Sequence, residues 1–183
     1  MPHELSPAPG SAAARERPIP AHWSVRAGRD AYLAENGFSV EAYDAPRTEA
    51  SVLRIRFSIP NTPQHRWAIQ LHDLHHVATG YGTDHTGEAE ISAWEAAHSL
   101  RGLGLYVGTI VVSGALLGLS IAPLRTLRAW RAARAPKSLF QRDDLAYEAL
   151  LQLSVGELRA LLGVPEDGLC DRPRRLHSFA PTA

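Results

Sequence analysis

Apolar positions along this chain recur mostly three and four residues apart, and this spacing predicts a mostly helical protein. One helix is expected from about Val25 to Asn36, because Gly37 is a good residue to follow a helix end. Thr62 and Pro63 predict the start of another helix, as an N-cap followed by proline at the first helical position. That helix should stop at Gly80.

Other patterns complete the expected elements. Residues 52–59 read V-L-R-I-R-F-S-I and alternate apolar with polar, which predicts a short strand or hairpin that ends at Pro60. A helix is expected over residues 143–151. Ser154 and Glu157 form a capping box, which predicts a last helix that stops near residues 163–165.

The length of 183 residues, with 45% hydrophobic residues, fits one domain with a substantial core. We expect a single-domain helical bundle over residues 21–165, with at most a short strand or hairpin near 52–59. Residues 1–20 are rich in Pro, Ala, Ser and Gly, which predicts a disordered tail. Residues 166–183 are expected to form a flexible tail.

Charge and cysteine content narrow the function. Lysine plus arginine equals aspartate plus glutamate, at 19 each, so the basic excess typical of nucleic-acid binding is missing. The single cysteine, Cys170, excludes an intrachain disulfide and a cysteine-rich zinc site. The first twenty residues lack the pattern of a secretory signal, so a cytoplasmic protein is expected.

Residues 102–124 carry no charged side chain and are followed by arginines every third residue, at positions 125, 128, 131 and 134. Their length alone allows a membrane span. We favour a buried hairpin or a long core helix, because only one such stretch exists. A third interpretation makes the stretch the wall of an apolar tunnel for a lipid tail, with the arginine-bearing helix on an anionic membrane surface.

The segment L-H-D-L-H-H-V-A-T-G-Y-G-T-D-H-T-G-E carries the candidate chemistry. His72 and His76 are four residues apart and share one helical face, while Asp73 lies off that face. Asp73 could bind an ion through a bent arrangement or orient an imidazole instead. The turn over residues 80–87 should return an antiparallel helix that brings Glu88 to His76. Such ligands suit a divalent metal, zinc first, with iron, manganese or cobalt as alternatives.

Three known metal patterns fit poorly. A zincin protease needs glutamate where this chain has Asp73. The nucleotide-hydrolysing HD superfamily draws further ligands from distant helices, and no clear partner set is visible. Membrane desaturases use several H-x-x-H-H boxes and about four spans, whereas this chain has at most one of each.

The H-D-x-x-H motif followed by eleven residues and E resembles the ubiquinone (coenzyme Q) biosynthesis family that carries this signature. The V-A-T-G after the second histidine, the T-D in the loop, the G-E at Glu88 and the following A-W-E extend the resemblance. It is close over about residues 66–98 and looser to about residue 165. The chain departs from the family in its apolar, glycine-rich stretch, and in having Ile69 where an arginine is expected and Arg66 one turn earlier.

This resemblance implies a helical protein that holds a divalent metal through His72, Asp73, His76 and Glu88, with Arg66 as a candidate carboxylate contact. It also implies a metal-dependent decarboxylase of quinone biosynthesis, which replaces a carboxylate by a hydroxyl at carbon 1 of a polyprenylated 4-hydroxybenzoate-derived ring. A non-catalytic, lipid-binding scaffold with a structural metal and a single-span membrane protein are the alternatives.

The partners implied are a prenylated quinone precursor or another lipid, and other quinone-biosynthesis proteins. A homodimer, and peripheral contact with the inner face of the cell membrane, are also expected.

Overall fold

The computed structural model describes residues 18–52, 55–133 and 138–170, and within these ranges the protein is mostly helical. Its α-helices are α1 (Val25–Glu35), α2 (Pro63–Thr79), α3 (His85–His98), α4 (Gly104–Ile121), α5 (Pro123–Ala132), α6 (Tyr147–Gln152) and α7 (Val155–Leu161). Two short 3-10 helices are η1 (Val40–Asp44) and η2 (Leu139–Gln141). The strands β1 (Arg47–Val52) and β2 (Ile55–Pro60) pair antiparallel, with Arg47 opposite Pro60.

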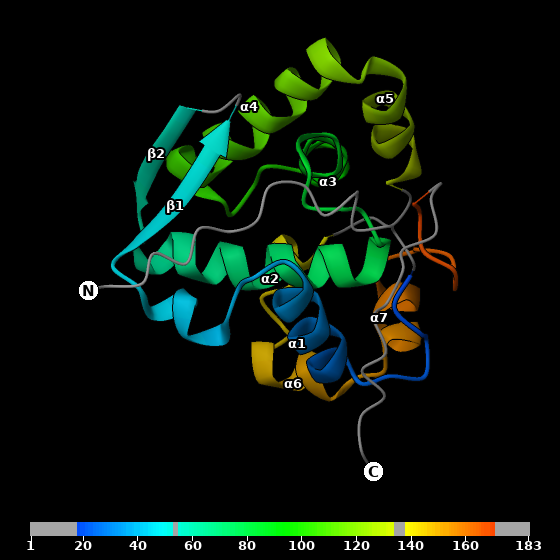
Figure 1. The fold of residues 1–183 in the computed structure, drawn as a ribbon. Coiled ribbons are helices and arrows are strands. Elements are labelled where there is room, and N and C mark those ends of the chain that lie inside the picture. Colours follow the sequence, from blue (N-terminus) through cyan, green and yellow to red (C-terminus); the bar gives the residue numbers. More distant parts are fainter. Residues whose placement is uncertain (1–17, 53–54, 134–137, 171–183) are drawn as a thin grey trace, which may run out of the picture.

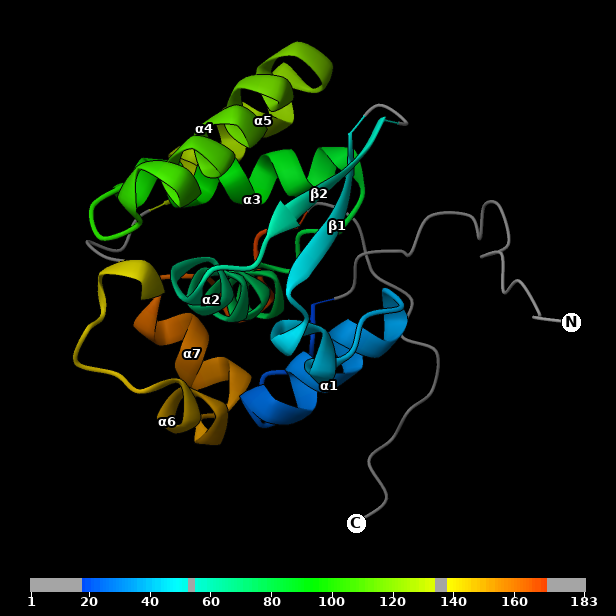
Figure 2. The same ribbon diagram turned by 90° about the vertical axis from the view of Figure 1, so that its left-hand side faces the viewer.

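Helix α2 lies in the middle of the molecule (Figures 1 and 2). Helices α1, α6 and α7 pack on one side of it, and α3, α4 and α5 lie on the other. The hydrophobic core follows this layering, since α2 contributes Leu71, Leu74 and Val77 and α3 contributes Ile91 and Trp94. The expected fold, a mostly helical bundle with a short hairpin, is confirmed.

Local signals place the ends of three helices where the sequence predicts them. Helix α1 ends at Glu35, and Gly37 after it is left-handed, with φ of 73°. The Thr62 hydroxyl accepts from the amide of His65 at the start of α2, and Gly80 ends that helix with φ of 78°. The expected capping box at Ser154 starts α7.

Other boundaries differ from the expectation. The alternating segment 52–59 is not one strand, because β1 ends at Val52 and β2 starts at Ile55. Helix α3 begins at His85 and not near Glu88, because the Asp84 side chain caps it. Helix α6 begins only at Tyr147, after a turn, so Asp143 and Asp144 do not open it.

The relation between α2 and α3 also differs from the antiparallel pair that the short loop predicts. Helix α3 crosses over α2, and each is seen nearly end-on in the view that shows the other from its side (Figures 1 and 2). The crossing brings the first turn of α3 over the C-terminal half of α2. Glu88 therefore still reaches His76, although the two helices do not run side by side.

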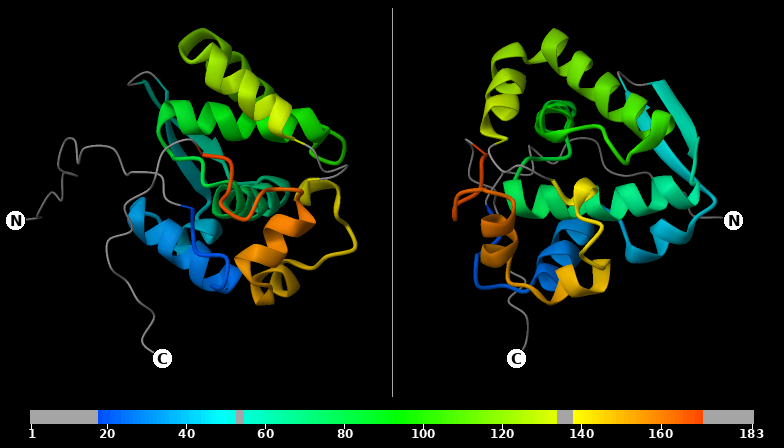
Figure 3. Two further views of the ribbon diagram at one scale, coloured as in Figure 1. Left: turned by 90° about the vertical axis from the view of Figure 1, so that its right-hand side faces the viewer. Right: turned by 180° about the vertical axis from the view of Figure 1, so that it is seen from behind.

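Helix α4 is the one helix of the described residues that is long and apolar enough to cross a membrane by length and composition. Only 22% of it is buried, so the expectation of a buried hairpin or core helix is wrong. Helices α4 and α5 form a helical hairpin that packs on α3 at the far side of the molecule from α6 and α7 (Figure 3).

The expected tails fall largely outside the described residues. At the N-terminal side the described chain begins at residue 18, and Ile19 is buried in the core. At the C-terminal side, residues 166–170 lie against the end of α2, where the Leu169 amide donates to the Thr79 carbonyl at 2.7 Å. Residues 1–17 and 171–183 are not described.

Candidate metal centre

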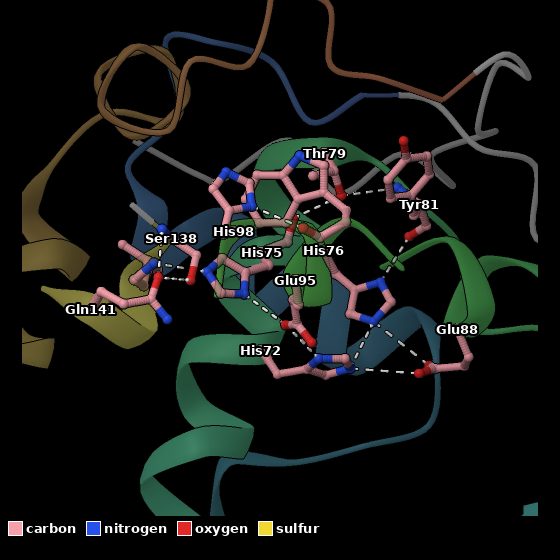
Figure 4. Close-up of polar contacts among 12 residues, drawn as sticks. His72, His75, His76, Thr79, Tyr81, Glu88, Glu95, His98, Ser138 and Gln141 are labelled. Atoms are coloured by element: carbon pink, nitrogen blue, oxygen red, sulfur yellow. Dashed lines mark hydrogen bonds and ion pairs between the residues drawn. The ribbon is translucent and has the colours of Figure 1, made fainter. Parts of the chain in front are cut away.

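Three predicted ligands converge where α3 crosses α2 (Figure 4). The Nε2 atoms of His72 and His76 lie 3.1 Å apart. The Oε2 atom of Glu88 lies 3.5 Å from the His72 Nε2, and its Oε1 atom lies 3.6 Å from the His76 Nε2. One ligand atom from each residue falls within 4.8 Å of the others, so this group could hold a metal ion.

The loop between the helices fixes the position of Glu88. Asp84 accepts from the amide of Gly87 at 2.7 Å and starts α3 one turn before Glu88. Gly87 lies so close under the loop that a Cβ atom there would come within 2.2 Å of the Gly82 carbonyl oxygen. A side chain at residue 87 would therefore push the loop and the first turn of α3 apart.

Hydrogen bonds on the far side of each imidazole fix which nitrogen faces the site. The Nδ1 of His76 lies 3.0 Å from the Tyr81 carbonyl oxygen, which can only accept. The Nδ1 of His72 lies 2.9 Å from Glu95 Oε1, which is an ionised carboxylate oxygen. Both Nδ1 atoms are therefore donors, and each neutral ring presents a lone pair at Nε2.

Two lone pairs that face each other at 3.1 Å, beside a carboxylate, need a positive charge between them. In the metal-free protein a proton on His72 supplies it. Burial opposes that charge, but Glu95 and Glu88 outweigh burial and raise the pKa of His72 well above its usual value. A divalent cation would supply a positive charge at the same place and could bind both Nε2 lone pairs, so these side chains fit a metal.

The other two candidate ligands, His76 and Glu88, stay in the form that can bind a metal. Burial lowers the pKa of His76 to about 4, so that ring is neutral at physiological pH. Burial would raise the pKa of Glu88, but His76 and His72 lower it instead. The ring of Tyr32, from α1, stacks on His76 at 5.2 Å and holds it from its other face.

Glu95 is a residue that the sequence analysis did not assign to the site. It is fully buried on α3 and accepts from His72 and also from His75, whose Nδ1 lies 2.7 Å from the same oxygen. Burial would raise the pKa of Glu95, but His72 and His75 lower it to about 2. Glu95 lies seven residues after Glu88, on the same face of α3, and this spacing is the signal that could have identified it.

His75 completes this arrangement. Its Nε2 accepts from the Leu139 amide at 3.1 Å, so its Nδ1 carries the hydrogen that Glu95 accepts. Burial lowers its pKa, which keeps the ring neutral. His75 is thus linked to the candidate ligand His72 through Glu95.

Two predicted site residues lie apart from the converging group. Asp73 accepts from the Tyr43 hydroxyl at 2.5 Å, and burial raises its pKa to about 6. Its role as a metal ligand stays a prediction. Arg66, six residues before His72 on α2, pairs with Asp44 at 3.1 Å, and its role as a contact for a substrate carboxylate also stays a prediction.

The arrangement of two histidines and one carboxylate leaves coordination positions open for water or substrate. His76 is fully buried, whereas the His72 and Glu88 side chains are 25% and 44% exposed. The site is therefore reached from the side of His72 and Glu88. Such a centre can polarise a bound oxygen atom, and a redox-active ion there can react with dioxygen.

Comparisons with protein-family models, with curated proteins and with solved structures found no match to this chain.

Proposed function

We propose that this protein is a metal-dependent enzyme of quinone biosynthesis that carries out oxidative decarboxylation of a prenylated 4-hydroxybenzoate-derived ring. The observation that carries the proposal is the convergence of His72, His76 and Glu88, three of the four ligand-type residues of the H-D-x-x-H…E signature. Zinc is the first candidate for the metal, with iron, manganese or cobalt as alternatives.

The reaction breaks the bond between ring carbon 1 and its carboxylate, and forms a bond from that carbon to oxygen. Carbon dioxide leaves, and the ring loses two electrons to an oxidant, for which dioxygen is the natural choice. A bound divalent metal would hold the carboxylate or phenolate as a Lewis acid, and a redox-active ion would also activate dioxygen. The protein contributes the fixed imidazoles, which Glu95 and the Tyr81 carbonyl orient.

The test is conversion of a prenylated 4-hydroxybenzoate derivative by the purified protein loaded in turn with zinc, iron, manganese or cobalt. Mass spectrometry should detect a product that has lost carbon dioxide and gained one oxygen. Glu88→Gln should abolish the product and keep the fold, whereas His85→Ala should not, because His85 is exposed and lies outside the converging group. No product with any of these metals would contradict the proposal.

The exposed apolar surface of α4 favours a second candidate, a non-catalytic lipid-binding scaffold of a quinone-biosynthesis complex with a structural metal. The two candidates differ in what Glu88→Gln does in a cell. The enzyme should lose turnover and fail to support quinone synthesis while it stays folded. The scaffold should continue to support synthesis unless it unfolds.

A further inference from the structure

The chain between α1 and Tyr43 borders the side from which the candidate metal centre is reached. We name residues 37–42 the strap. In Figure 4 the chain after α1, in faint blue, curves past Glu88 and continues below His72 in that view. The two ends of the strap are tied to the segments that carry the candidate ligands, and these ties fix where it lies.

At its first end the strap is held beside the loop that leads to Glu88. The Thr83 hydroxyl donates to the Asn36 side-chain oxygen at 2.5 Å and so joins this loop to the end of α1. The next residue, Gly37, is left-handed with φ of 73°, and a Cβ atom there would meet nothing within 4 Å. The chain therefore has room to swing at Gly37.

At its other end the strap is anchored firmly. The buried Tyr43 hydroxyl donates to the carboxylate of Asp73, the residue after His72. The side-chain amide of Asn61 donates to the carbonyl oxygens of Tyr43 and Ala45, both at 2.8 Å. The strap therefore leads from the loop before Glu88 to the neighbour of His72.

Between these ends the strap is exposed at every residue. The amides of Gly37 and Phe38 donate back to the carbonyls of Ala34 and Leu33 in α1, at 3.2 and 2.8 Å. The Ala42 amide donates to the Ser39 carbonyl within the strap, at 3.1 Å. Segments with exposed backbone and few buried contacts open locally at a low free-energy cost. The strap therefore has the properties of a moving cover.

The strap also carries two large apolar side chains. Phe38 is 52% exposed, and Val40, two residues further on, is 40% exposed. Ligand sites are lined mainly by apolar and aromatic side chains, with a few polar groups that fix the orientation of the ligand. At this entrance the polar groups are His72 and Glu88, and the strap supplies the apolar ones.

From these contacts we infer that the strap is a gate of the candidate metal centre, and that Phe38 and Val40 make it select flat aromatic ligands over charged hydrophilic ones. The inference rests on the proposed function and deepens it, because it names the residues that control which ligand reaches the centre. Opening separates the strap end from the loop at the Thr83–Asn36 contact. Closing places the two apolar side chains against the bound ring and excludes water.

Zinc exchange with the full chain tests the gate. Thr83→Val should raise the rates of zinc uptake and of zinc removal by EDTA about fivefold each, the effect expected for one lost hydrogen bond. Because Thr83 is not a candidate ligand, both rates should change together and the zinc affinity should stay the same. The matched control is Thr109→Val, whose hydroxyl donates to the Leu105 carbonyl on α4, and it should exchange zinc as the wild type does.

Selectivity is tested with two chelators, since phenanthroline is flat and aromatic whereas EDTA is charged and hydrophilic. Phe38→Ala should lower the ratio of the zinc-removal rate by phenanthroline to that by EDTA about tenfold, because the apolar contact is lost. Leu100→Ala, at a side chain that is 38% exposed after α3, is the matched control and should keep the wild-type ratio.

The inference is overturned if Thr83→Val exchanges zinc like Thr109→Val, or if Phe38→Ala keeps the wild-type ratio. It is also overturned if Thr83→Val changes the zinc affinity and only one of the two rates, since Thr83 would then act on the ligands and not on access. A protein that takes up no zinc overturns the gate together with the metal centre. A protein that exchanges zinc as expected but converts no ring substrate contradicts only the proposed reaction, so the two failures are distinguishable.

Discussion

The residue that most strongly organises the candidate metal centre is one that would not bind the metal. Glu95 accepts from His72 and His75 through one oxygen, and it is fully buried. The carboxylate fixes the His72 ring so that Nε2 faces His76 and Glu88. Such partners of metal ligands raise the basicity of the imidazole and hold its orientation.

Replacing Glu95 by Gln should lower metal affinity about 10- to 100-fold while the helical circular dichroism signal is retained. The reason is the loss of the charge that orients His72. A competition titration against a metal-binding dye measures the affinity. Glu166→Gln, at an exposed carboxylate, is the matched control and should bind as the wild type does. Equal affinities for both variants would contradict the role of Glu95.

The contact between Glu95 and His72 also predicts that the stability of the metal-free protein depends on pH. Because the folded pKa of His72 is raised, its contribution to stability is present below the unfolded value of about 6.5 and is lost as pH rises through the folded pKa. The free energy of unfolding should fall by up to about 1.4 kcal/mol per pH unit over that window. Urea unfolding of wild type and Glu95→Gln at several pH values measures this slope. It should be smaller in the variant, and equal slopes would contradict the coupling.

Asp73 offers a further test at the same scale. Its carboxylate accepts from the Tyr43 hydroxyl and is not among the converging ligand atoms. We therefore expect Asp73→Asn to lower metal affinity less than about 10-fold, below the loss expected for a ligand. The dye titration used for Glu95 measures it. Loss of the metal from a folded Asp73→Asn protein would show that Asp73 binds the ion, as the family resemblance implies.

At the scale of elements, the centre depends on the turn between α2 and α3. Gly80 is left-handed, Asp84 caps α3, and Gly87 lies against Gly82. The glycine of the T-G-E segment, Gly87, is therefore required for close packing as well as being part of the motif. Glu88 reaches the histidines because the loop can approach Gly87 without a side chain in between.

Gly87→Ala should lower both metal affinity and stability, the latter by about 1–3 kcal/mol, because the new methyl group meets the backbone of Gly82. Gly108→Ala is the matched control. A Cβ atom at Gly108 meets nothing within 4 Å, and alanine favours a helix by up to about 1 kcal/mol. Denaturant unfolding and metal titration of both variants measure the difference. A Gly87→Ala protein as stable as Gly108→Ala would contradict the packing account.

The sequence allowed the prediction of elements with local signals and missed relations between elements. Caps at Thr62 and Ser154 gave the starts of α2 and α7, because a side chain bonds to the backbone three residues on. The crossing of α3 over α2 was missed, since it depends on the packing of distant helices. The exposure of α4 was missed because hydropathy reports composition and not which faces are covered.

At the candidate site, too, features with a local sequence signal were predictable and contacts between elements were not. The spacing of His72 and His76 on one helix, and a loop of suitable length before Glu88, were enough to predict that these three side chains come together. The Tyr81 carbonyl and the Leu139 amide were not predictable, because backbone groups at a site carry no sequence signal. Asp73 resembles a ligand in the sequence, but the described structure pairs it with Tyr43.

At the scale of the whole molecule, α3 joins two surfaces (Figure 1). One face carries Glu88 and Glu95 towards α2, and a neighbouring face carries Ala89 and Ser92 against the glycines of α4. A substitution at an exposed apolar residue of α4, such as Leu116→Glu, should therefore leave metal affinity in the dye titration unchanged. A large effect of Leu116→Glu on metal affinity would show that the two surfaces are coupled.

The most direct test of the metal centre is the metal content of the protein after stripping and reloading. Elemental analysis should find about one divalent ion per chain in the wild type and in His85→Ala. It should find almost none in His76→Ala or Glu88→Gln, with the fold checked by circular dichroism. A wild-type protein that takes up no zinc, iron, manganese or cobalt, or a His76→Ala variant that keeps a full equivalent, would contradict the account.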